Sequence, residues 1–516
     1  MNVWKFCRTT LGCGADVYET RKASRRGAST PGRELRVKAR NKKIAPLASW
    51  RFAFAFPRLR VCAWSISLAA LIIALSSSFP ALALDVKTLP AAKGEEVWYV
   101  SDHTLPIIAM TVALPAGSAY DPAGKPGLAN FAAQLMDEGA GNLRSDAFQT
   151  ALGNRAIRLT ISTERDYVIV TLVTLSGNAR DAFQLLGSAL SHPRFDADAV
   201  ARVRAQIGAD LADQEDDPAA MAEKGFYRTY FGDHAYAHPV AGTRSSLAAI
   251  NAAELRRFAA THWVCRGLKV AISGDVDRNS LAPLLKSAFG GLAAGSLHGF
   301  PAVARSGKTG VTLIAMEVPQ PNAVFGLPGL LRSDPRYIAG FVANYILGGG
   351  GFSSRLTSEL REKRGLTYDV STSLESLRKA GLVLGTVATK RGSMKETVSV
   401  LRDVLKDFSQ NGPTDRELAD AKTYLTGSYP LAFSSNLGTV DQLGTFQRIG
   451  LDVNYVQNRN ALINAVTLDQ VKQAARRLFD PARLTVVVAG SYGNSSSNAG
   501  SRKTSAAAGG KPSSAH

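Results

Sequence analysis

The chain has 516 residues and a formal net charge of +19, with 61 lysines and arginines against 42 aspartates and glutamates. The first 60 residues contribute +12 of that charge, so the basicity belongs mostly to an N-terminal extension and gives little support to a nucleic-acid-binding protein. Cys7, Cys13 and Cys62 lie near the start and Cys265 stands alone beyond them, which excludes a disulfide-stabilised fold.

An export signal follows the basic stretch. Arg58 and Arg60 precede the apolar run 61–75, and Ala81-Leu82-Ala83 has the small-x-small pattern of a cleavage site. The run is short for a membrane-spanning helix, so we expect cleavage after Ala83, with a retained anchor as the alternative. A signal preceded by roughly fifty residues is unusual, and a translation start further into the chain would explain it. We expect the mature protein in the periplasm, with Cys265 as a buried small residue rather than a nucleophile.

The chain beyond the signal repeats itself at an offset of 216 residues. Segments 250–274 and 466–490 align without gaps, and each opens with a capping box and ends with an apolar strand and a glycine. The capping-box pairs are Asn251 with Glu254 and Thr467 with Gln470. The strand-like segment 106–114 likewise corresponds to 323–327. This pattern predicts an α+β protein of two homologous halves, each a mostly antiparallel sheet with helices packed on it.

The same reasoning gives the expected domain boundaries. The predicted segments are a basic extension with signal peptide (1–83), an N-terminal domain (85–292), a linker (293–309), a C-terminal domain (310–490) and a disordered tail (491–516).

The most specific motif lies at residues 347–368, which read LGGGGFSSRLTSELREKRGLTY. Its glycines allow positive φ angles and the close approach of another chain or a ligand. These glycines are Gly348, Gly349, Gly350 and Gly351. Ser353 or Ser354 should cap a helix after them, and Gly365 should end that helix.

This motif resembles the second half of the M16 (pitrilysin/insulinase) family of zinc metallopeptidases, whose subunits often read LGGG-x-x-SRL followed by LREKRGL-x-Y. The resemblance implies that Arg361 and Tyr368 face the zinc site of another half and help hold the substrate and its oxyanion, with the glycines as a substrate-binding wall. It also implies a chain of two homologous halves that forms one half of a clamshell around a peptide. Without the resemblance, a solvent-facing arginine at a helix end and a strand tyrosine would be the simpler interpretation.

Zinc peptidases of this family carry H-x-x-E-H on a helix, where the two histidines bind Zn²⁺ and the glutamate activates the metal-bound water. Here the lead Pro126-Gly-Leu-Ala129 is followed by Asn130 and Gln134 at the histidine positions and Ala133 at the glutamate position. A more distant glutamate ligand aligns with Gln206. Neutral amides are poor zinc ligands and alanine cannot accept a proton, so we expect no metal or other cofactor on this chain.

Two other groups of possible ligands have simpler interpretations. His234 and His238 are four residues apart, but the stretch around them is rich in glycine, aspartate and proline, which favours loop histidines over metal ligands. The acidic residues between 210 and 217 precede Pro218, and we interpret them as a solvated helix end.

The sequence therefore predicts a non-catalytic subunit of a periplasmic M16-type heterodimer, inactive alone. Its partner would carry the intact H-x-x-E-H motif and zinc, and this chain would contribute substrate and oxyanion contacts for peptide hydrolysis. The alternative is a non-enzymatic peptide-binding or assembly scaffold that uses the clamshell cavity. An unrelated active site has no Ser/His/Asp or Cys/His arrangement to support it, and we expect no nucleic-acid partner and no stable membrane anchor after cleavage.

Overall fold

The computed structural model describes residues 84–90, 92–297, 299, 303 and 308–493. The predictions for the extension, the signal peptide and the tail beyond residue 493 lie outside the described residues. None of the described helices combines the length and the apolar composition needed to cross a bilayer.

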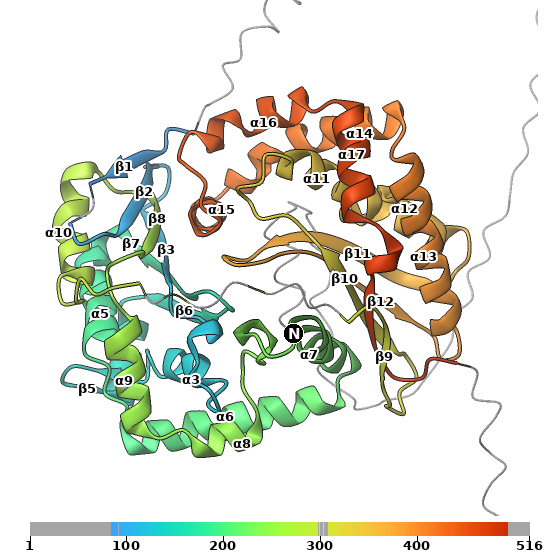
Figure 1. Cartoon of the computed structure of the whole chain (residues 1–516). Coiled ribbons are helices and arrows are strands. Elements are labelled where there is room, and N and C mark those ends of the chain that lie inside the picture. Colours follow the sequence, from blue (N-terminus) through green and yellow to red (C-terminus); the bar gives the residue numbers. More distant parts are fainter. Residues whose placement is uncertain (1–83, 91, 298, 300–302, 304–307, 494–516) are drawn as a thin grey trace, which may run out of the picture. The chain divides into compact units, whose positions relative to one another are not determined.

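The first half is built on a six-stranded sheet with the order β1-β2-β8-β3-β7-β6 (Figure 1). Neighbouring strands run antiparallel, except that β2 and β8 pair in parallel. The strands are β1 (Lys87–Leu89), β2 (Glu96–Ser101), β3 (Ile107–Leu114), β6 (Arg158–Thr163), β7 (Val168–Leu175) and β8 (Lys269–Gly274), with a separate small hairpin of β4 (Gly139–Ala140) and β5 (Leu143–Arg144). The helices are α3 (Leu128–Gln134), α4 (Ser145–Asn154), α5 (Ala179–Ser191), α6 (Ala197–Asp216), α7 (Pro218–Phe231), α8 (Arg244–Ala249), α9 (Ala252–His262) and α10 (Arg278–Phe289).

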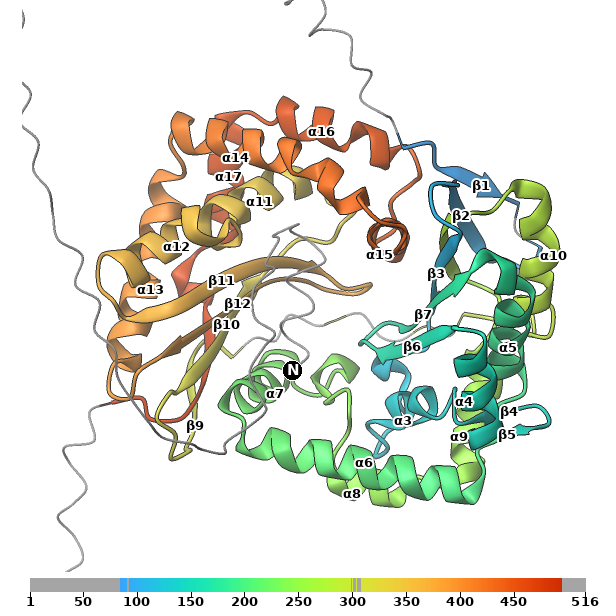
Figure 2. The same ribbon diagram turned by 180° about the vertical axis from the view of Figure 1, so that it is seen from behind.

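The second half repeats this plan on a five-stranded sheet with the order β11-β12-β10-β13-β9 (Figure 2). Again all neighbours are antiparallel except one pair, β13 with β9. The strands are β9 (Gly310–Ile314), β10 (Asn322–Pro328), β11 (Thr367–Ser376), β12 (Gly381–Thr389) and β13 (Thr485–Ala489). The helices are α11 (Tyr337–Asn344), α12 (Arg355–Thr357), α13 (Met394–Asn411), α14 (Asp415–Gly427), α15 (Asn436–Arg448), α16 (Tyr455–Ala465) and α17 (Leu468–Leu478).

The repeated strand order confirms the α+β class and the two homologous halves. Five strands of each sheet have the same order and the same directions, with β2 corresponding to β9 and β8 to β13. The predicted capping boxes are both present, because Asn251 pairs with Glu254 at the start of α9 and Thr467 with Gln470 at the start of α17. Local capping signals therefore determine equivalent helix starts in the two halves.

Both faces of each sheet are buried, and the two faces have different cover. In β3, Met110 and Val112 enter the core that the first half forms with its own helices, whereas Ala109 enters a second core on the opposite face. Alternate residues of a strand point to opposite faces, so a strand buried on both sides needs two layers of cover.

The second layer of cover comes from the other half. Helix α7 belongs to the first half by sequence, but it packs on β10 and β13 of the second sheet. The ring of Phe226 lies so close to Gly326 of β10 that a Cβ at this glycine would be 2.4 Å from the ring. The absence of a side chain at Gly326 therefore lets Phe226 of α7 pack directly against the sheet.

Helix α15 makes the reciprocal contact, from the second half to β3 and β8 of the first sheet (Figure 1). Leu443 is fully buried in this core, which also contains Trp98. The side chain of Gln447 donates hydrogen bonds to the carbonyl oxygens of Glu96 (3.1 Å) and Val270 (3.2 Å). Each sheet is thus completed by a helix that the other half supplies.

Shortening Leu443 to alanine tests this exchange. Leu443→Ala should lower the free energy of unfolding by about 2–5 kcal/mol, because a fully buried leucine leaves a cavity between α15 and the first sheet. Urea unfolding followed by circular dichroism measures the change. Leu437→Ala on the same helix is the control, since Leu437 is 42% exposed and its truncation should change stability by about 0.5 kcal/mol or less. Equal effects of the two substitutions would contradict the packing of α15.

Candidate functional site

The glycine-rich segment follows α11, and its glycines serve two different purposes. Gly351 has a φ of +58°, in the left-handed region that favours glycine. Gly348 is needed for space, because a Cβ there would lie 2.5 Å from Oγ1 of Thr372 on β11. Gly349 and Gly350 pack closely against the preceding helical turn. The sequence allows a positive φ at each of the four glycines, but only Gly351 adopts one.

The helix predicted after these glycines is present but short. The Ser354 side chain accepts a hydrogen bond from the Thr357 backbone N–H (3.3 Å) and so caps α12. A wider π-type turn, Ser358–Glu362, continues the helix in place of a regular α-helical turn. Gly365 ends it with a φ of +58°, as expected from sequence.

Tyr368 lies at the start of β11, on a β-bulge that the sequence pattern did not reveal. The pairing of β11 with β12 shifts register between Thr367 and Val370, which leaves one extra residue on β11. The hydroxyl of buried Thr367 accepts the Asp369 backbone N–H (3.1 Å) and stabilises this bulge. A bulge redirects the side chains beside it, and here the Tyr368 ring is 76% exposed.

The structure brings Arg361 and Tyr368 together. The guanidinium carbon of Arg361, on the π-type turn, lies 4.5 Å from the centre of the Tyr368 ring. It also lies 4.6 Å from the centre of the Phe352 ring, which is 71% exposed. Both distances are typical of cation–π contacts.

Arg361 lacks the ion-pair partner that each of the other cations of residues 347–368 has within the described part of the chain. Across the described part of the chain, no carboxylate lies within ion-pair distance of its guanidinium, and its contacts are the two aromatic rings. The other three cations are paired: Arg355 with Glu417 and Asp407, and Lys363 and Arg364 with Glu359. The N–H groups of Arg361 are therefore available to a hydrogen-bond acceptor from outside.

Helix α3 carries the residues that the sequence resemblance aligns with the zinc motif, and these residues do not fit a zinc ion. Asn130 is buried, and its Oδ1 accepts a hydrogen bond from Nε2 of Gln134 (3.4 Å). Ala133 is fully buried in the core. Gln206 lies on the exposed side of α6, and among the described residues no hydrogen bond joins its side chain to Asn130 or Gln134. The two amides are joined by this one hydrogen bond, and they offer neither imidazole nor carboxylate to a metal.

Asp121 holds the start of α3 in place of a conventional cap. Gly127 occupies the N-cap position with a φ of +93° and has no side chain to cap the helix. The carboxylate of Asp121 accepts hydrogen bonds from the backbone N–H groups of Gly127 and Ala129, both 2.7 Å long. Burial raises the pKa of Asp121 to about 7, although these two donors favour the charged form.

The remaining candidate ligands are loop or surface residues. Among the described residues, no group of three or more His, Cys, Asp or Glu side chains has the arrangement of a metal site. His234 caps a short 3₁₀ turn, Ala235–Ala237, by accepting the Tyr236 N–H. Burial, followed by the neighbouring His234, lowers the pKa of His238. These contacts fit the interpretation of both histidines as loop residues.

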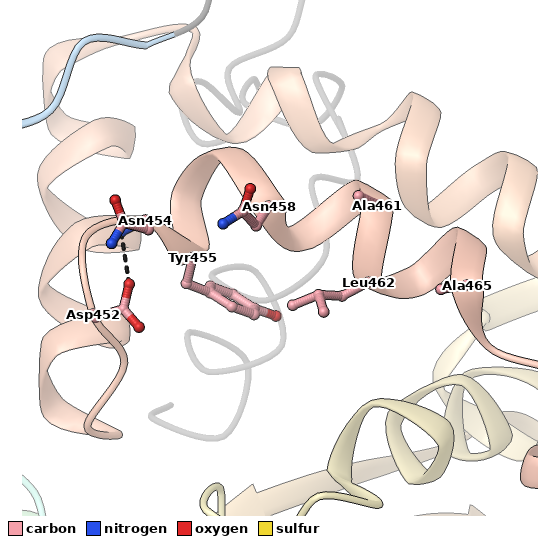
Figure 3. A pocket seen from close by; sticks show the side chains of 7 residues that line it. All are labelled: Asp452, Asn454, Tyr455, Asn458, Ala461, Leu462 and Ala465. Atoms are coloured by element: carbon pink, nitrogen blue, oxygen red, sulfur yellow. Dashed lines mark hydrogen bonds between the residues drawn. The ribbon is translucent and has the colours of Figure 1, made fainter.

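The Arg361 and Tyr368 cluster is separate from the cavity shown in Figure 3. That cavity, of about 550 Å³, lies along α16 and is lined by Asp452, Asn454, Tyr455, Asn458, Ala461, Leu462 and Ala465. None of the residues singled out from the sequence belongs to it. The Tyr368 and Phe352 rings beside Arg361 are instead exposed at the surface.

These features define an α+β protein of two repeated halves, in which helix α3 carries no histidine, cysteine or carboxylate side chain and an exposed tyrosine lies beside Arg361. Two family profiles match the chain: "Insulinase (Peptidase family M16)" over residues 96–244 and "Peptidase M16 inactive domain" over residues 249–425. The chain belongs to the M16 family.

Similar proteins include both zinc-protease-like and inactive members. The chain is 26% identical over 375 residues to "Non-peptidase homolog YmxG" from Helicobacter pylori, covering 73% of this chain and 87% of that protein. It is 33% identical over 282 residues to an "Uncharacterized zinc protease" from Streptomyces coelicolor, covering 53% of this chain and 61% of that protein. A crystal structure described as "peptidase M16 inactive domain" from Pseudomonas fluorescens superposes with a TM-score of 0.74 at 29% identity, covering 79% of this chain and 98% of that one.

The raised pKa of Asp121 predicts how stability depends on pH. The folded protein binds the Asp121 proton up to about pH 7, whereas the unfolded chain loses it near pH 4. The free energy of unfolding should therefore fall by roughly 1–4 kcal/mol from this group as the pH rises from about 4 to about 7. Urea unfolding at a series of pH values measures the slope.

The variant Asp121→Asn should remove this part of the slope, because the amide does not titrate. Asp85→Asn is the matched control, since the Asp85 side chain is 76% exposed and pairs with Lys87 at the surface. An unchanged slope in Asp121→Asn would show that Asp121 is not the titrating group.

Proposed function

We propose that this chain is the zinc-less subunit of a periplasmic M16-type heterodimer. It would supply Arg361 and Tyr368 to peptide hydrolysis at the zinc site of a partner subunit with an intact H-x-x-E-H motif. The observation that carries the proposal is the guanidinium of Arg361, which has no carboxylate partner in the described part of the chain and lies beside an exposed tyrosine.

The chemistry of this pair suits a peptide bond under attack. The guanidinium N–H groups and the phenol O–H can donate hydrogen bonds to a peptide carbonyl. Charged donors bind an oxyanion more strongly than a neutral carbonyl, so they stabilise the transition state more than the bound substrate. The glycines before them have no side chains and let an extended peptide approach the backbone.

The residues of α3 support the zinc-less part of the proposal. Asn130, Ala133 and Gln134 replace both histidines and the glutamate of the zinc motif, and Asn130 is bonded to Gln134 rather than left open to a ligand. The non-peptidase homolog and the inactive-domain structure are relatives with a corresponding description. The metal and its activated water would come from the partner subunit.

A scaffold without any catalytic contribution is the alternative function. The description of the Helicobacter pylori relative as a non-peptidase homolog suits this alternative as well. The two proposals differ in their requirement for Arg361, because a scaffold that only holds a peptide needs no donor at an oxyanion.

The exported protein itself tests the zinc-less assignment. Untagged protein isolated from the periplasmic fraction should begin at Leu84 and contain less than about one zinc ion per ten chains, since amides bind zinc poorly. N-terminal sequencing and elemental analysis measure the two quantities. Stoichiometric zinc that resists dialysis would contradict the assignment, and a cytoplasmic protein with residues 1–83 intact would contradict the proposed export.

Substitutions in the Arg/Tyr pair test the contribution in trans. In a complex with an H-x-x-E-H subunit from the same organism, Arg361→Ala should lower kcat/KM on a pool of internally quenched peptides by about 10²–10³-fold, as loss of an oxyanion donor does elsewhere. Tyr368→Phe should lower it less, because one neutral donor is lost.

Arg364→Ala is the matched control, since this neighbouring arginine is paired with Glu359. It should change kcat/KM by less than about 2-fold, the effect of a surface ion pair. Full activity of Arg361→Ala in an assembled complex would reject the proposed role and favour the scaffold.

A further inference from the structure

Phe352 is a third member of the Arg361 and Tyr368 cluster that the sequence motif did not indicate. It lies in the 3₁₀ turn Gly351–Ser353, and its ring is 71% exposed. The Arg361 guanidinium is 4.6 Å from this ring and 4.5 Å from the Tyr368 ring. Both rings therefore lie beside the same guanidinium.

Separate backbone features bring these three side chains together. The positive φ of Gly351 turns the chain just before Phe352. The π-type turn Ser358–Glu362 carries Arg361, and the bulge at Thr367 directs Tyr368 outward. Because each feature departs from regular helix or strand geometry, the cluster is a product of the local fold rather than of helical spacing.

The rings can fix the direction of the guanidinium without neutralising its charge. An arginine side chain loses rotamer entropy when it is immobilised. A carboxylate could offset this loss, but it would also occupy the N–H groups, as Glu417 does for Arg355. Aromatic faces attract the guanidinium and leave its N–H edge free.

We propose that Phe352 is a positioning residue: together with Tyr368 it holds the Arg361 guanidinium, so that the N–H groups are presented to an acceptor on the peptide. The inference rests on the proposed function for the identity of that acceptor. The holding of the guanidinium itself is a property of this chain alone, and it can be measured without a partner.

The first experiment measures the position of the guanidinium in the isolated mature chain. With ¹⁵N-labelled arginine, the Arg361 Nε–H resonance, assigned from its loss in Arg361→Lys, should show the upfield shift that stacked rings cause. Phe352→Leu should remove part of this shift, whereas Phe352→Trp should retain it. An unchanged resonance in Phe352→Leu would overturn the proposal, because the ring would then not lie over the guanidinium in solution.

The second experiment measures turnover by the complex on the same quenched peptides. Phe352→Leu should lower kcat/KM by about 2- to 5-fold, the fold-change that corresponds to one exposed cation–π contact, and Phe352→Trp should restore it. Leu313→Ala is the control. Leu313 lies on β9, the edge strand of the second sheet opposite to β11, and its side chain is exposed and apolar, so its removal should have no effect on turnover.

The outcomes separate the two proposals. Equal losses of kcat/KM in Phe352→Leu and Phe352→Trp, or no loss in Phe352→Leu, would overturn the positioning role. The effect of Arg361→Ala on kcat/KM would still test the proposed function by itself. A complex that tolerates Arg361→Ala would reject the proposed function, and with it the positioning role in catalysis, even where the spectra show the stacked guanidinium.

Discussion

The exchange of helices between the two halves is the constraint on which the rest of the structure depends. Each sheet is apolar on both faces, and its own helices cover one face. The other face is covered by α7 in one direction and by α15 in the other, with Phe226 against Gly326 and Leu443 against the strands of the first sheet. Neither half buries its full apolar surface alone, so the two repeats are expected to fold as one unit.

Helix α3 is held in place by contacts that require no metal ion. The helix start is held by the Asp121 carboxylate, and Phe131 and Ala132 are fully buried in the core of the first half. These contacts do not involve the three positions where a zinc peptidase has its ligands and base. The first half therefore keeps its packing with amides and alanine at the positions that the sequence resemblance aligns with the zinc motif.

Two arginines of the second half, Arg355 and Arg361, have different kinds of contact. Arg355 is tied to Glu417 and Asp407 and anchors α12 to α13 and α14, which is a structural use of the charge. Arg361, two turns further on, is held by aromatic rings and keeps its hydrogen-bond donors free. A charge that is oriented but not neutralised is suited to recognition of an external acceptor, and this contrast marks Arg361 among its neighbours.

The sequence alone determined the features that depend on nearby residues. The repeat indicated two halves, and the capping boxes at Asn251 and Thr467 located equivalent helices in them. Gly365 marked the end of the helical segment after α12, because glycine readily adopts the left-handed conformation that ends a helix. The absence of zinc ligands at Asn130 and Gln134 was also visible, since ligand chemistry follows from residue type. Only the tertiary structure decided the exchange of α7 and α15, the bulge at Thr367 and the stacking of Phe352 on Arg361. These features depend on packing between distant segments and on one extra residue in a strand register, and neither leaves a periodic signal in the sequence.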